Sequence, residues 1–138
     1  MQPSRRALIT GAAAWTGSHI QHDASWIHRL DDAAVSEIDR ALVHAKRAGA
    51  RIPFSKDLFP LQRVAVQFDR ILEEIAHGVG FALVRGIPRA RYTDDECEII
   101  YWGLGAHLGS PVSQNARGHL LGHVRDEGRT QADPNARA

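Results

Sequence analysis

Residues 80–109, GFALVRGIPRARYTDDECEIIYWGLGAHLG, join a strand signal to the best-marked helix of the chain. The apolar run FALVRGI, bounded by a glycine and a proline, is typical of a buried strand. The segment TDDE that follows is a capping box, in which Thr93 accepts from the backbone amide of Glu96 and the Glu96 side chain reaches back. It predicts a helix over residues 93–108 that ends at Gly109.

The predicted helix has an apolar stripe and two interior glycines. Four residues at helical spacing form the stripe that we expect to be buried: Cys97, Ile100, Leu104 and Leu108. On this stripe Cys97 is a core residue rather than a nucleophile. The segment GLGAHLG mimics a dinucleotide fingerprint, but such a fingerprint follows a strand and opens a helix. We therefore expect its glycines to admit a closely packed neighbour.

Two further helices are predicted upstream. The first covers residues 32–48, is capped by Asp31, and has apolar residues at helical spacing: Val35, Ile38, Leu42 and Ala45. The second covers residues 61–77, ends at Gly78, and has one apolar face: Val64, Phe68, Ile71, Leu72 and Ile75. From residue 110 onward we expect a loop, with a short strand at HLLGHV, residues 119–124. The last ten residues, 129–138, form a polar tail that we expect to be disordered.

This inventory of elements leaves the strand short of partners. One strand, or two short ones, makes a sheet of marginal stability with unpaired backbone groups. The chain therefore resembles an unfinished fold, and we expect partial helicity and exposed apolar surface. A sharp, cooperative thermal transition would count against this expectation.

Composition excludes several classes of protein. The chain has 138 residues, one domain's worth, and its 17 basic and 16 acidic residues nearly cancel. This balance gives no electrostatic footprint for nucleic acid or an anionic membrane. No stretch approaches the apolar length of a membrane span. The single cysteine excludes an internal disulfide and a multi-cysteine zinc site, so we expect a cytoplasmic protein.

The chain has eight histidines, which are potential metal ligands. The strongest pair is His119 and His123, four residues apart, with Asp126 as a third candidate. Gly118 and Gly122 argue against a rigid helix there, and there is no H-E-x-x-H motif. No histidine of the chain has Asp or Glu two positions later, so the H-x-D or H-x-E form of a non-haem iron site is absent. We assign no metal ligand and no catalytic residue.

Several stretches, taken in order, resemble a known family. They are WTGSHI, SWIHRLDDAAVSEID, GFALVRGIP, YTDDECEIIYWGLGAHLGSPVSQNARGHLLGHVRDEG and ADPN. Together they are similar to the N-terminal part of TauD/TfdA-like dioxygenases. The resemblance covers most of residues 12–135, and it is specific over residues 80–128.

The resemblance implies an Fe(II)- and 2-oxoglutarate-dependent oxygenase on a double-stranded β-helix, or jelly-roll, of the α+β class. In the family an H-x-D motif and a distal histidine hold iron, and an arginine near the C-terminus binds 2-oxoglutarate. This sequence stops just before the H-x-D motif, so none of these residues can be carried over. The loop after the LG-x-P turn lies beside the pocket in the family, which makes Gln114, Asn115 and His119 candidates for lining a substrate pocket. Their alternative role is to cap turns and hold the loop.

We therefore interpret residues 1–128 as the N-terminal portion of a TauD/TfdA-like domain, with its helices and first strand or strands. An intact relative would oxidise a small-molecule substrate. The chain alone is expected to be inactive and to bind neither Fe(II) nor 2-oxoglutarate. Two alternatives remain: a small, non-catalytic helical binding module that pairs its exposed strand with a partner, and a metal binder at His119 and His123. Substrate and oligomeric state remain open.

Overall fold

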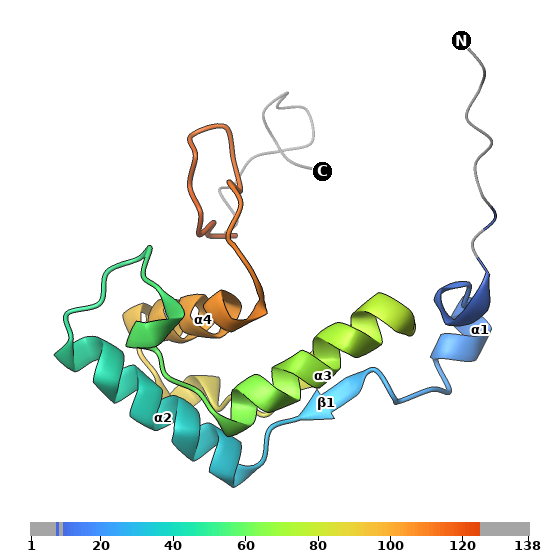
Figure 1. The fold of residues 1–138 in the computed structure, drawn as a ribbon, viewed down its shortest axis with the longest axis horizontal. Helices are drawn as coiled ribbons and strands as arrows, with labels where there is room; N and C mark the ends of the chain where they lie inside the picture. Colours follow the sequence, from blue (N-terminus) through green and yellow to red (C-terminus); the bar gives the residue numbers. More distant parts are fainter. Residues whose placement is uncertain (1–7, 9, 125–138) are drawn as a thin grey trace.

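The computed structural model describes residue 8 and residues 10–124. Three long helices dominate it: α2 (Asp32–Arg47), α3 (Arg63–His77) and α4 (Asp94–Leu108). A two-stranded parallel sheet, β1 (Ile27–Arg29) and β2 (Leu83–Arg85), runs alongside α3 (Figure 1). A short helix α1 (Gly17–Ile20) and three 3-10 turns complete the elements: Gly11–Ala13, Lys56–Leu58 and Arg89–Arg91. The architecture is thus mixed α and β, as expected, while the jelly-roll stays a prediction.

Helix α2 forms as predicted and supplies the largest share of the core. The Asp31 carboxylate accepts a hydrogen bond from the Ala34 amide at 2.9 Å, which caps the first turn. The helix ends at Arg47, and Gly49 has a φ of 66°, which glycine adopts at low cost. The predicted stripe is buried, together with two alanines beside it: Ala34, Val35, Ile38, Ala41, Leu42 and Ala45.

Helix α3 is capped by a side chain from another helix. Its own N-cap residue, Gln62, makes no side-chain cap. Instead the Glu37 carboxylate of α2 accepts from the amides of Gln62 at 2.5 Å, Arg63 at 3.1 Å and Val64 at 2.9 Å. These amides are among those that a helix leaves without partners in its first turn. The helix therefore starts at Arg63, two residues later than predicted, because the Glu37 carboxylate caps it at this position.

The environment of Glu37 lowers the pKa of its carboxyl group. Partial burial raises the pKa, but the amide hydrogen bonds from Gln62, Val64 and Arg63, helped by the Arg40 charge, outweigh it. The ionised carboxylate is therefore the form that the fold stabilises.

Helix α4 begins with the predicted capping box, which the structure confirms. The Glu96 carboxylate accepts from the Thr93 amide at 3.0 Å and also binds Lys46 of α2 at 2.6 Å. The hydrogen bond from Lys46 is the main reason that the pKa of Glu96 is lowered. Just before the helix, the Tyr92 hydroxyl donates to Asp39 of α2 at 2.7 Å. Burial, followed by this contact, raises the pKa of Tyr92 to about 12.

The loop between α2 and α3 is held against α4. Phe59 is fully buried, and its ring lies so close to Gly103 that a Cβ there would be 2.3 Å from the ring. The Trp102 indole donates to the Phe54 carbonyl at 2.8 Å, and His107 Nε2 lies 2.8 Å from the Phe59 carbonyl. The predicted close packing is thus confirmed at Gly103, whereas a Cβ at Gly105 would meet nothing within 4 Å.

Three expectations were wrong in detail. The buried strand is only the three residues of β2, and both Leu83 and Arg85 are exposed because the described chain covers one face of the sheet. Residues 119–124 form no strand and instead follow a turn closed by local hydrogen bonds. Leu108, the last residue of the α4 stripe, is 42% exposed and lines an open groove.

Three further expectations concern exposed apolar surface, the C-terminal tail and membrane-spanning helices. Exposed apolar surface was predicted and is present: Tyr101 is 71% and Val112 69% exposed. The predicted tail, residues 129–138, lies outside the described residues. No helix within residue 8 and residues 10–124 has both the length and the apolar character to cross a membrane.

Replacing Gly103 with alanine is expected to destabilise the fold by about 2 kcal/mol, because the new methyl group overlaps the buried Phe59 ring. The matched control is Gly105→Ala, in the same helix, which is expected to stabilise by about 1 kcal/mol because an open helical glycine is replaced by a better helix former. Chemical denaturation followed by circular dichroism measures both. Equal effects of the two substitutions would contradict the close packing.

Replacing Glu37 with glutamine is expected to destabilise the fold by about 2 kcal/mol at pH 7, since hydrogen bonds from three amides to a charged acceptor are weakened. The folded-state pKa of Glu37 is lowered, so its contribution is complete above the ordinary value of 4.5. It is lost as the pH falls through the folded-state pKa. Denaturation at pH 7 and at pH 3 should show that the difference in unfolding free energy between wild type and variant becomes smaller in acid. A constant difference would contradict the role of the Glu37 carboxylate as the cap of α3.

Candidate functional site

An open groove of about 1160 Å³ lies between α4, the loop at residues 53–56 and the loop that follows α4. In Figure 1 this last loop is drawn in orange and extends away from the end of α4. The lining is mainly apolar and includes Phe54, Val84, Ile87, Tyr101, Leu108 and Leu121. A groove of this size and character suits the apolar part of a small molecule or of a polypeptide.

Few polar side chains enter the groove. His123 from the loop and Glu98 from α4 form its polar edge, with His123 Nε2 at 3.4 Å from Glu98 Oε1. Both side chains are partly exposed, so the pair contributes little to stability. It joins the loop after α4 to the helix and so sets one boundary of the groove.

The three predicted pocket residues lie together in one turn. Gln114 lines the groove, but its side chain donates to the Val112 carbonyl at 2.9 Å. The side-chain oxygen Oδ1 of Asn115 accepts from the backbone amides of Arg117 at 3.0 Å and His119 at 3.2 Å. Asn115 and His119 also face each other, Nδ2 to Nδ1, at 3.0 Å, and neither lines the groove. Their contacts are those of residues that hold a turn, and a role in a pocket stays a prediction.

The structure does not bring His119 and His123 to a common site. His119 pairs with Asn115 in the turn, and His123 pairs with Glu98 on α4. Within the described chain no three His, Cys, Asp or Glu side chains are grouped as a metal site would require. The third candidate ligand, Asp126, lies outside the described residues. These donors therefore do not fit Fe(II), which needs two histidines and a carboxylate on one face.

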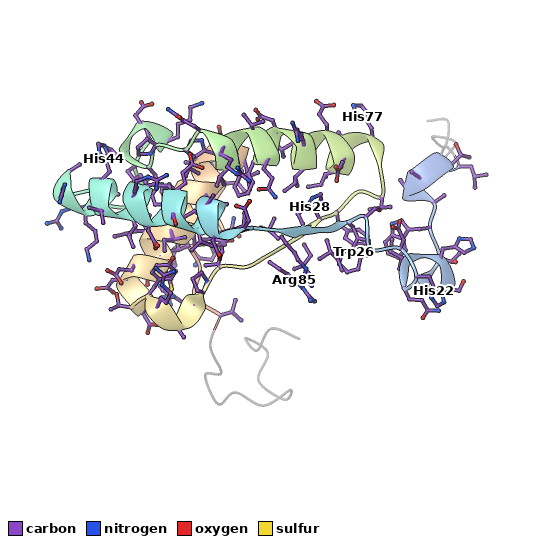
Figure 2. The ribbon with its side chains drawn as sticks, turned by 90° about the horizontal axis from the view of Figure 1, so that it is seen from below. His22, Trp26, His28, His44, His77 and Arg85 are labelled. Atoms are coloured by element: carbon purple, nitrogen blue, oxygen red, sulfur yellow. The ribbon has the colours of Figure 1, made fainter. Side chains whose placement is uncertain are left out.

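Sequence reasoning missed a second cluster, between the sheet and α3. Figure 2 shows His28 pointing from β1 toward α3. Its Nε2 lies 3.0 Å from the Glu74 carboxylate, although the orientation is not that of a hydrogen bond. Beside it, the Trp26 ring packs on Phe81 at 5.2 Å between centroids, and its buried Nε1 has no partner in the described chain. No spacing in the sequence indicates these contacts, because β1 was not predicted.

Comparison with known proteins gives two relatives, and no protein-family model matches. FR-33289 synthase of Streptomyces rubellomurinus is 28% identical over 122 residues, which cover 88% of this chain and 36% of that protein. The taurine hydroxylase-like protein SAT17 of Stachybotrys chartarum is 25% identical over 115 residues, 82% of this chain and 30% of that protein. The chain is a distant homologue of both. It spans about a third of the length of these relatives.

The turn that holds the predicted pocket residues can be tested directly. Asn115→Ala removes the acceptor of two amides, so hydrogen exchange at Arg117 and His119 is expected to rise by about tenfold. In Gln114→Ala the backbone amide that donates to the His119 carbonyl remains, so the turn should stay closed. Hydrogen exchange measured by NMR on both variants distinguishes the role of Asn115 from that of Gln114. Unchanged exchange at Arg117 and His119 in Asn115→Ala would contradict the role of Asn115 in holding the turn.

Proposed function

We propose that this chain is the N-terminal, helical part of a TauD-like Fe(II)- and 2-oxoglutarate-dependent dioxygenase. The observation that carries the proposal is the similarity over 82% of the chain to a taurine hydroxylase-like protein, of which this chain spans 30%. FR-33289 synthase supports it with a similar share. The resemblance of residues 80–128 to TauD/TfdA-like enzymes points the same way.

Within such an enzyme this chain would supply a wall of the pocket and no chemistry. The apolar groove along α4 would contact the apolar part of a small substrate, and Gln114 would border it. Iron and 2-oxoglutarate would be held by residues outside this chain, because the described donors do not fit the metal. The chain alone would therefore be inactive. A cytoplasmic location suits its one cysteine.

The proposal is tested by reading the gene past the codon for Ala138. An in-frame continuation that encodes H-x-D and a distal histidine is expected. The longer protein should then consume 2-oxoglutarate only with Fe(II), whereas residues 1–138 should consume none. An Asp→Ala change in that H-x-D motif is the matched control. A stop codon at this position, or a continuation without the motif, would contradict the proposed dioxygenase function.

A second candidate function is a small, non-catalytic helical binding module. It is favoured by the exposed strand β2 and the exposed apolar side chains around the groove. Such a module should form a discrete complex of fixed stoichiometry with a partner. Size-exclusion chromatography with light scattering distinguishes this complex from the aggregation expected of an incomplete fold.

A further inference from the structure

We draw no further inference here: the strongest candidate, the pair of Arg29 and Arg85 side by side on the exposed face of the β1–β2 sheet, carries nothing because nothing within the described residues shows what covers that face.

Discussion

The described fold depends on one carboxylate, that of Glu37, which accepts hydrogen bonds from three backbone amides at the start of α3. The helix has no cap of its own, so its first turn is satisfied only when α2 is in place. Three other charged groups at α2 also reach outward. Asp31 contacts Arg63, Asp39 contacts Arg91 and Tyr92, and Lys46 contacts Glu96. Helix α2 thus orients both of the other long helices through its polar face, while its apolar face packs between them.

Two parts of the described chain are open: the sheet and the C-terminal end of α4. The sheet has two strands, one covered face and one free edge, and α4 ends in an exposed leucine beside the groove. These openings are what a larger protein would cover, and distant relatives about three times as long are consistent with this. They are also what a binding module would use. Within the described residues, no three His, Cys, Asp or Glu side chains are grouped as a metal site would require.

Sequence reasoning succeeded where a structure is determined by near neighbours in the chain. The capping box at Thr93, the Asp31 cap and the stripe of α2 were predicted because their partners lie within a few residues. It failed for β1, for the late start of α3 and for the exposure of Leu108. Each of these depends on a partner distant in the chain or on its lack. At the candidate site, the family resemblance proposed Gln114, Asn115 and His119 as pocket residues, a role that stays a prediction. The groove itself could not be predicted, because it requires the folded arrangement of α4 and two loops.

The remote cap of α3 also constrains the order in which the chain folds. Glu37 and Val64 are 27 residues apart, and Asp39 and Tyr92 are 53 apart, so these contacts close long loops. Helix α4 has its own capping box and can form its first turn early, but α3 cannot complete its first turn before it meets α2. The capped first turn of α3 therefore forms together with the docking of α3 on α2.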